Sequence, residues 1–320
     1  MAFVLGIVLP GLVFHVAEKW YLHTEKRPPV ESSPTEQSSE QATIPQAGEY
    51  RINVLNTSSD IENMELNTYL VGVLLGELPA DFDAETMKAQ AVVARTYALK
   101  RQTTNQKHSG AVCMESACCQ AYCGIDDYLA KGGTQETVDK VTAAVNATAY
   151  QILTYHNQLI EATYFSCSGG RTEDAVAVWG AEIPYLQAVD SPGEEQAAHY
   201  TDSVQFSKQE FANLLNISPK GQLATWFGNI TYTNGGGVDT IVIAGKTFQG
   251  TELRKLLGLR STVFTITAIG NSVHIVTKGF GHRVGMSQYG AEAMAARGEN
   301  YVQILSHYYP GTELKDYGQN

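Results

Sequence analysis

One segment limits how much of this chain can fold. Residues 26–48 read KRPPVESSPTEQSSEQATIPQAG and contain four prolines, four serines and three glutamates. A segment of this composition cannot bury enough apolar surface to form a core. We therefore expect a linker over residues 23–48, semi-rigid near its prolines, and a folded region over residues 49–317.

A short apolar segment precedes the linker. Residues 2–14 read AFVLGIVLPGLVF and carry no charge. The run is shorter than the roughly 20 residues that a spanning helix needs, and no Lys or Arg precedes it. We interpret residues 1–22 as an N-terminal signal anchor that holds the rest of the chain at the cell membrane, outside the cytoplasm. The alternative is a buried strand or helix, which Pro10 and the polar stretch behind it fit poorly.

The pattern of the remaining chain predicts an α+β fold. Strand-like alternation at 51–55 is followed by apolar residues at helical spacing from Leu66 to Glu77. Further helices are predicted at 84–102, 134–147, 251–257, 287–297 and 301–309, and hairpins within 150–166 and 263–278. Strands do not alternate with crossover helices, so we expect a mixed, largely antiparallel sheet with packed helices. Residues 203–260 are a possible inserted subdomain.

The charge balance argues against a nucleic-acid partner. The chain has 22 Lys and Arg against 33 Asp and Glu, a formal charge of −11. A nucleic-acid binder needs a basic face to replace the counterions of phosphate groups. The 17 tyrosines suit a surface that stacks on sugars or peptides, and they suit an ordinary core equally well.

Glu77 is the candidate general acid. It lies on the apolar face of its helix, in the last turn before Pro79. Partial desolvation and the negative end of the helix dipole both raise the pKa of a carboxyl group. An acid that stays protonated near neutral pH can protonate a glycosidic oxygen. The alternative is an edge position at which Glu77 simply reaches water, and Lys88 and Arg95 would lower its pKa if they lie close.

Four of the five cysteines fall within eleven residues, close to a histidine. Thiolate and imidazole groups in a short loop suit tetrahedral zinc, with His108, Cys113 and Cys119 as candidate ligands. The zinc would be structural, because no HExxH motif accompanies it. A local disulfide such as Cys113 with Cys119, in an oxidising compartment, remains the alternative.

Two loops combine glycine with hydroxyl and polar groups. Residues 166–172 read SCSGGRT, and residues 281–290 read GHRVGMSQYG. Glycine lets the backbone approach a ligand closely, and loops of this density often contact ligands. For residues 166–172 a tight structural turn is the alternative. There is no GxSxG elbow, which argues against a serine nucleophile.

Four motifs in this order resemble the stage II sporulation protein D family, which is related to the amidase-enhancer proteins. They are GELPADFDAETMKAQAVVARTYAL (76–99), CQAY (119–122), ATYFSCSGGRTEDAVAVWG (162–180) with PYL (184–186), and GFGHRVGMSQYGAEAMAARG (279–298) with YVQILSHYYPGTEL (301–314). The resemblance implies a lytic transglycosylase that cleaves peptidoglycan glycan strands during forespore engulfment. The strands are first stripped of stem peptides by a partner amidase, stage II sporulation protein P, within the membrane engulfment complex.

The resemblance also assigns roles to residues. The family's catalytic Glu maps onto Glu77. Clostridial members hold zinc with one His and two Cys, which map best onto His108, Cys113 and Cys119. The substrate groove is expected to involve Lys88, Arg95, Ser166, Ser168, Gly169, Gly170, Thr172, His282, Arg283, Ser287, Gln288 and Tyr289.

Some features of the sequence depart from the family pattern or leave alternatives open. Arg283 stands where the family often has glycine, and Cys118 and Cys123 make the ligand set ambiguous. Of the cations in the motif segments, Arg95 is the first candidate to pair with the lactyl carboxylate of muramic acid. The competing function is a glycan-binding enhancer of a cell-wall amidase that does not cut. A zinc hydrolase would need an open metal position, which a cysteine-rich ligand set disfavours.

Overall fold

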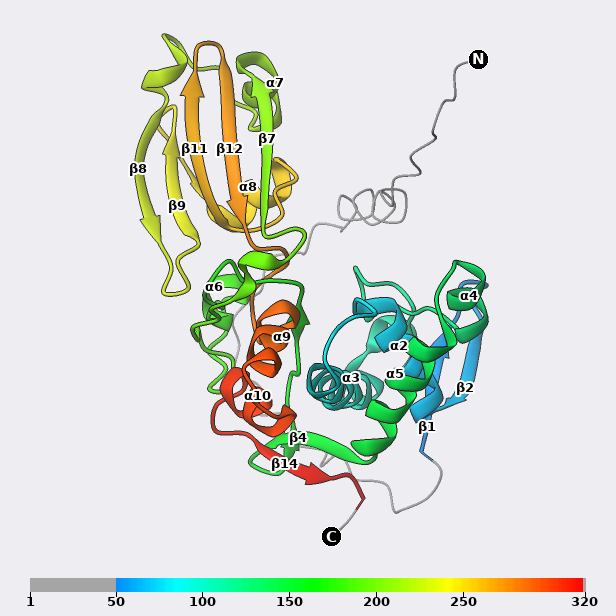
Figure 1. Ribbon diagram of the computed structural model, residues 1–320. Helices are drawn as coiled ribbons and strands as arrows, with labels where there is room; N and C mark the ends of the chain where they lie inside the picture. The colour runs from blue at the N-terminus through cyan, green and yellow to red at the C-terminus, as the bar shows by residue number, and fades with distance from the viewer. Residues whose placement is uncertain (1–49, 319–320) are drawn as a thin grey trace, which may run out of the picture. The chain divides into compact units, whose positions relative to one another are not determined.

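The computed structural model describes residues 50–318 and has the expected α+β architecture (Figure 1). The helices are α2 (Leu66–Glu77), α3 (Ala84–Thr104), α4 (Ile125–Ala130), α5 (Gln135–Ala147), α6 (Ala175–Trp179), α7 (Lys208–Leu214), α8 (Gly250–Leu256), α9 (Gln288–Ala296) and α10 (Tyr301–Tyr308), with 3-10 turns η2 (Gln106–His108), η3 (Glu194–Gln196) and η4 (Leu223–Thr225). The strands are β1 (Arg51–Leu55), β2 (Ile61–Glu65), β3 (Val112–Cys113), β4 (Gln151–Tyr155), β5 (Gln158–Leu159), β6 (Tyr164–Phe165), β7 (Thr201–Ser207), β8 (Phe227–Tyr232), β9 (Val238–Ile243), β10 (Lys246–Gln249), β11 (Val263–Ile269), β12 (Ser272–Lys278), β13 (Met286–Ser287) and β14 (Glu313–Asp316). Most of the strand pairs are antiparallel, as the sequence predicted.

Helix α2 forms the centre of the first hydrophobic core. The Glu65 carboxylate caps its first turn by accepting hydrogen bonds from the backbone N–H groups of Asn67 and Thr68. Its side chains from Tyr69 to Leu75 are all buried, so the helix is apolar on every side rather than along one stripe. Helices α3 and α5 pack against it (Figure 1), and the Asp83 side chain caps the start of α3 as its residue type suggested.

A short parallel strand pair brings two distant loops together. Strand β6 pairs with β13, with Met286 opposite Tyr164 and Ser287 opposite Phe165. The pair lies beside a second core built from α3, α9 and α10. Residues 166–172, the first glycine-containing loop of the sequence, follow β6. The second, residues 281–290, leads into β13 and the first turn of α9.

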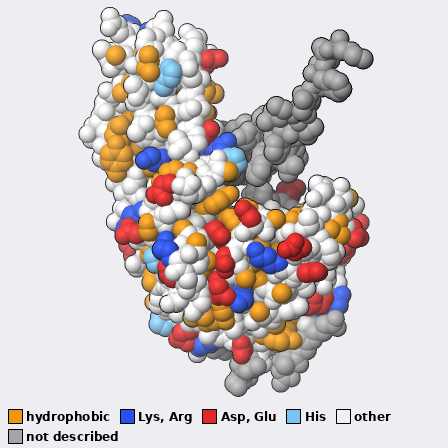
Figure 2. Space-filling model, viewed as in Figure 1, with side chains coloured by type: hydrophobic (Ala, Val, Ile, Leu, Met, Phe, Trp, Pro, Cys, Tyr) orange, Lys and Arg blue, Asp and Glu red, His pale blue; other side chains and the backbone are white. Residues whose placement is uncertain are grey.

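Residues 201–278 form a region with its own hydrophobic core, which includes Phe211, Ile241 and Ile275. It contains two three-stranded antiparallel sheets, in the orders β11-β12-β7 and β10-β9-β8. Because β7 pairs with β12 along its whole length, the region extends beyond the expected limits of 203–260. Figure 2 shows few charged side chains on the visible face of this region. Those in its sequence are mostly basic, seven Lys and Arg against four Asp and Glu.

The expected anchor, residues 1–22, and the expected linker, residues 23–48, lie outside the described residues. Among residues 50–318, no helix is both long and apolar enough to cross a membrane. The anchor therefore stays a prediction from sequence.

Candidate active site

Glu77 is the last residue of α2, and three polar groups from other segments reach its carboxylate. Oε1 accepts hydrogen bonds from the backbone N–H of Ala121, at 2.7 Å, and from the hydroxyl of Tyr164, at 3.1 Å. Oε2 lies 3.5 Å from Nε2 of Gln288. The side chain is partly buried, so the carboxylate lies in a sheltered but accessible position.

Burial is the main influence on the acidity of Glu77. Desolvation raises the pKa of its carboxyl group, and the three hydrogen-bond donors oppose this without cancelling it. The direction agrees with the expectation from sequence. A carboxyl group with a raised pKa and a fixed orientation has the properties of a general acid.

Residues 121–123, which include the Ala121 donor to Glu77, lie against two glycines of α2. A Cβ atom on Gly76 would stand 2.9 Å from the backbone nitrogen of Tyr122 and 3.1 Å from the carbonyl carbon of Ala121. A Cβ on Gly72 would collide with the Tyr122 ring, and the backbone N–H of Cys123 donates to the Gly72 carbonyl at 2.9 Å. The two glycines, four residues apart, thus let the backbone of residues 121–123 come close enough to reach the carboxylate.

This close approach predicts the effect of Gly76→Ala. Overpacking of this kind typically costs about 1–3 kcal/mol, more than the roughly 1 kcal/mol that alanine gains inside a helix. We expect a lower free energy of unfolding by denaturant, and a slower rate of the glycan cleavage that the sequence resemblance implies, because Ala121 moves away from Glu77. Gly124→Ala is the control, since its Cβ would meet only Tyr122 Cε1, at 3.9 Å. Equal cleavage by Gly76→Ala and the wild type would contradict the role of this contact.

The β6–β13 pair connects both polar loops to Glu77. Tyr164 belongs to β6, and Gln288 directly follows β13 as the first residue of α9. The Ser166 carbonyl accepts a hydrogen bond from the Tyr289 N–H at 3.0 Å and lies 3.3 Å from the Ser287 hydroxyl oxygen. Of the predicted groove residues, Gln288 contacts Glu77 directly. Ser166 lies two residues after Tyr164, and Tyr289 directly follows Gln288.

A buried carboxylate that the sequence analysis missed holds these loops in place. Glu194 is 1% exposed and accepts hydrogen bonds from the backbone N–H groups of Ser168 and Gly169. The hydroxyl groups of Ser168, Ser191 and Ser287 also donate to it. Ser168 and Ser287 are themselves fully buried, so their hydroxyls are directed at Glu194. This placement favours a role for both serines in organising the loops rather than in contacting a sugar.

Arg283 has a similar organising role. Its guanidinium is 1% exposed and donates to the carbonyl oxygens of Ser168, Arg171 and Gly235. It also pairs with the buried Glu173 at 3.4 Å. The φ angle of Arg283 is 69°, in the left-handed region that favours glycine. The arginine instead ties the loop to the turn at Gly235.

The cations expected to bind the lactyl carboxylate are differently placed. Arg95 is 1% exposed, and its guanidinium donates to the carbonyl oxygens of Val145 and Gln151. It therefore links α3 to α5 and β4 inside the core. This placement favours a structural role over the expected pairing with the lactyl carboxylate. The Lys88 amine is partly exposed and pairs with Glu85 three residues earlier.

The other predicted groove residues fall into two groups. Thr172 is buried, and its hydroxyl accepts the N–H of Val189 at 2.8 Å. Gly169 and Gly170 are partly exposed and have positive φ angles of 84° and 113°. His282 is partly exposed beside Trp179, and desolvation lowers the pKa of its imidazole to about 4, so it is neutral at physiological pH.

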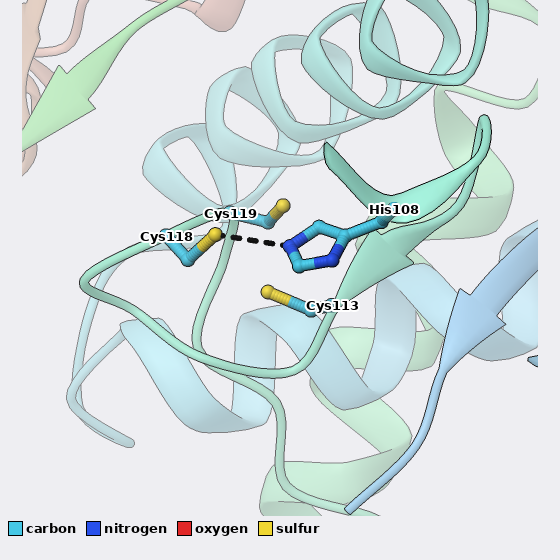
Figure 3. Close-up of side chains that lie close together, drawn as sticks. All are labelled: His108, Cys113, Cys118 and Cys119. Atoms are coloured by element: carbon cyan, nitrogen blue, oxygen red, sulfur yellow. Dashed lines mark hydrogen bonds between the residues drawn. The ribbon is translucent and has the colours of Figure 1, made fainter. Parts of the chain in front are cut away.

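A cluster of four potential metal ligands lies at the other end of the loop that reaches Glu77. His108, Cys113, Cys118 and Cys119 point toward one another, and all their ligand atoms lie within 4.8 Å of one another (Figure 3). Nε2 of His108 is 3.2 Å from Sγ of Cys118. All five cysteines are free thiols. One imidazole and three sulfur atoms form a donor set that could hold a metal ion, and Cys118 joins the three candidate ligands named from the sequence.

Comparison with known proteins places the chain in a family. A family model described as Stage II sporulation protein matches residues 55–155. The chain is 38% identical over 289 residues to stage II sporulation protein D of Bacillus subtilis (strain 168), an alignment that covers 88% of this chain and 84% of that protein. The chain belongs to the stage II sporulation protein D family. It is also 39% identical over 272 residues to the protein of that name from Bacillus amyloliquefaciens, with 83% and 78% of the two chains covered.

A more distant relative carries a different name. The amidase enhancer of Bacillus subtilis (strain 168) is 28% identical over 307 residues, which cover 78% of this chain and 40% of that protein. The family resemblance inferred from the four motifs is thus confirmed, and the link to amidase enhancers is confirmed with it.

Proposed function

We propose that the chain is a lytic transglycosylase that cleaves peptide-stripped glycan strands of peptidoglycan during sporulation, with Glu77 as its single acid and base. The observation that carries the proposal is the Glu77 carboxylate itself. It combines a raised pKa with donors from three separate segments and a partly accessible position. Membership of a sporulation family supports the biological setting.

One carboxyl group can perform both steps of this reaction in sequence. Protonated Glu77 gives its proton to the oxygen that joins the muramic acid and glucosamine residues, and the bond from that oxygen to the anomeric carbon breaks. The carboxylate then takes the proton of the muramic acid C6 hydroxyl while that oxygen bonds to the anomeric carbon. The product is a 1,6-anhydro sugar, Glu77 is protonated again, and no water is consumed, so a second catalytic carboxylate is not required.

The alternative is a protein that grips glycan and activates a partner amidase without cutting. The relative named amidase enhancer favours this second candidate. Glu77 discriminates between the two, because a binding protein has no use for a desolvated carboxyl group with a raised pKa. We therefore retain the enzyme as the first candidate.

We propose that zinc is bound by His108, Cys113, Cys118 and Cys119. The convergence of the four ligand atoms supports this assignment. Four protein ligands complete a tetrahedral shell, which is typical of a structural site and leaves no open position for a zinc hydrolase. The metal would hold together the loop whose far end, at Ala121, reaches Glu77.

We propose further that the protein is held at the cell membrane by residues 1–22, with the catalytic region outside the cytoplasm. Its partners would be the glycan strand, the sporulation amidase stage II sporulation protein P and the membrane engulfment complex. An amidase that removes stem peptides would supply the stripped strands that we propose as substrate.

This substrate preference gives the test of the proposed function. Purified protein should release products from peptide-stripped glycan at least about tenfold faster than from intact peptidoglycan of the same source, because the stem peptide occupies space beside the scissile bond. Release of soluble sugar measures both rates. Equal rates would overturn the substrate assignment, and no release from either substrate would favour the enhancer.

A further inference from the structure

The two carboxylate oxygens of Glu77 are held unequally. Oε1 accepts the Ala121 N–H at 2.7 Å and the Tyr164 hydroxyl at 3.1 Å, whereas Oε2 has the Gln288 amide alone, at 3.5 Å. The last distance is at the outer limit of a hydrogen bond, so it contributes little. Oε1 therefore has its acceptor sites in use, and Oε2 is the oxygen with room for a proton.

The hydroxyl of Tyr164 is itself oriented by a buried amide. Nε2 of Gln120 donates to the Tyr164 oxygen at 3.1 Å, which leaves the single hydroxyl hydrogen of Tyr164 for Glu77. Gln120 is fully buried, and in the sequence it stands between Cys119 of the cysteine cluster and Ala121.

Two neighbours fix the orientation of the Gln120 amide. Its oxygen accepts the Tyr69 hydroxyl at 3.2 Å, and its nitrogen faces the Ala94 carbonyl oxygen at 3.5 Å. The opposite orientation would place two acceptor oxygens against each other at Ala94. Tyr69, Gln120, Tyr164 and Glu77 thus form one directed chain of hydrogen bonds that ends on Oε1.

We infer that Gln120 and Tyr164 are positioning residues that hold Oε1 of Glu77 as a fixed acceptor, so that Oε2 carries the proton exchanged with the glycan. This inference rests on the proposed function. In the first step the Oε2–H bond breaks, the proton joins the glycosidic oxygen, and that oxygen keeps the electron pair of its bond to the anomeric carbon. In the second step Oε2 takes the proton of the C6 hydroxyl.

The surroundings keep Tyr164 a donor throughout this cycle. Burial first, and the nearby charge of Glu77 second, raise the pKa of Tyr164 well above its usual value. The phenol therefore stays protonated at physiological pH. Tyr69 on α2 is the other tyrosine of the hydrogen-bonded chain. Burial first, and the charge of the Cys119 thiolate second, raise the pKa of its hydroxyl well above the usual value.

Tyr164→Phe tests the inference. The variant keeps the ring and removes the hydroxyl that donates to Oε1 of Glu77, so we expect kcat on peptide-stripped glycan to fall about tenfold to a hundredfold. KM should change by less than about twofold, because the ring still fills its place. The control is Tyr50→Phe, because the Tyr50 hydroxyl donates to the Tyr317 carbonyl at 3.0 Å and the Tyr50 backbone contacts Leu66, at the opposite end of α2 from Glu77. Its kcat should equal that of the wild type.

A double-mutant cycle shows whether Gln120 acts through Tyr164. Gln120→Met should lower kcat less than or as much as Tyr164→Phe, and the double variant should be no slower than Tyr164→Phe alone. If Gln120→Met does not fold, Tyr69→Phe replaces it in the cycle, because it removes the donor that orients the amide.

The outcomes separate the inference from the proposed function. A wild-type kcat for Tyr164→Phe, or effects that multiply in the double variant, would overturn the positioning chain while Glu77→Gln remains inactive. Activity of Glu77→Gln itself would instead overturn the proposed function.

Discussion

Glu77→Gln should abolish glycan cleavage, with a loss of about 10²–10⁴ in rate, while the protein stays folded. Loss of a general acid typically has an effect of this size, and glutamine has nearly the same shape without a transferable proton. The Ala121 N–H and the Tyr164 hydroxyl can still donate to the amide oxygen. Release of soluble sugar from peptide-stripped glycan measures the loss, and circular dichroism checks the fold.

The matched control is Glu136→Gln. Glu136 is an exposed glutamate in the first turn of α5, and its substitution makes the same chemical change at a residue that is not among the contacts of the Glu77 carboxylate. It should cleave at the wild-type rate. Near wild-type turnover by Glu77→Gln would show that Glu77 is not the acid.

Stability should also respond to this substitution, with a sign that follows from the raised pKa of Glu77. A carboxyl group whose pKa is higher in the folded than in the unfolded state stabilises the protein at low pH, and this contribution is lost as the pH rises through the folded-state pKa. Glutamine does not titrate. The free energy of unfolding of Glu77→Gln, relative to the wild type, should therefore increase with pH and level off above that pKa.

Disruption of the cysteine cluster should have the second large effect. The protein purified without chelator should carry about one equivalent of zinc, and Cys118→Ser or Cys119→Ser should lose it. Zinc sites of this kind contribute strongly to folding, with apparent binding free energies of about 10–16 kcal/mol in small zinc domains. We expect both variants to unfold at clearly lower denaturant concentration and to cleave slowly, because the loop that reaches Glu77 loses its anchor.

Cys123→Ser is the control for this experiment. Cys123 lies in the same loop but outside the group of converging ligands, so zinc content and stability should stay near the wild type. Metal analysis and denaturant unfolding measure both quantities. Absence of metal together with a Cys113–Cys119 disulfide in the wild type would overturn the zinc assignment, and full zinc content in Cys118→Ser would remove Cys118 from the ligand set.

Local patterns in the sequence sufficed for the helices around the site. The spacing of apolar residues and the caps gave α2 and α3 within about two residues, and it put Glu77 at the end of α2. The spacing of apolar residues could not show that α2 is buried on every side. That burial depends on helices α3 and α5 and on the loop at residues 121–123, which covers the face of α2 that carries Gly72 and Gly76. Gly72 and Gly76 were the available signal, as small residues four apart in an otherwise large-residue helix.

The partners of Glu77 were harder to predict, because they come from distant parts of the chain. Tyr164 is 87 residues away and Ala121 is 44 residues away, and no periodicity relates them. Both lie in the quoted motifs, but a motif does not say which side chains face inward. Arg95 shows the converse difficulty. Its residue type and its place in a motif made it the first candidate for the lactyl carboxylate, whereas its guanidinium bonds to carbonyl groups of the core.

Mass spectrometry of the products from peptide-stripped glycan tests the central claim most directly. A transglycosylase that uses Glu77 alone as acid and base should release fragments that end in 1,6-anhydro-muramic acid. Each fragment should be lighter than the corresponding hydrolysis product by one water, about 18 Da. The same digestion with Glu77→Gln should release none. Fragments with hydrated reducing ends, or anhydro fragments from the Glu77→Gln variant, would contradict the account.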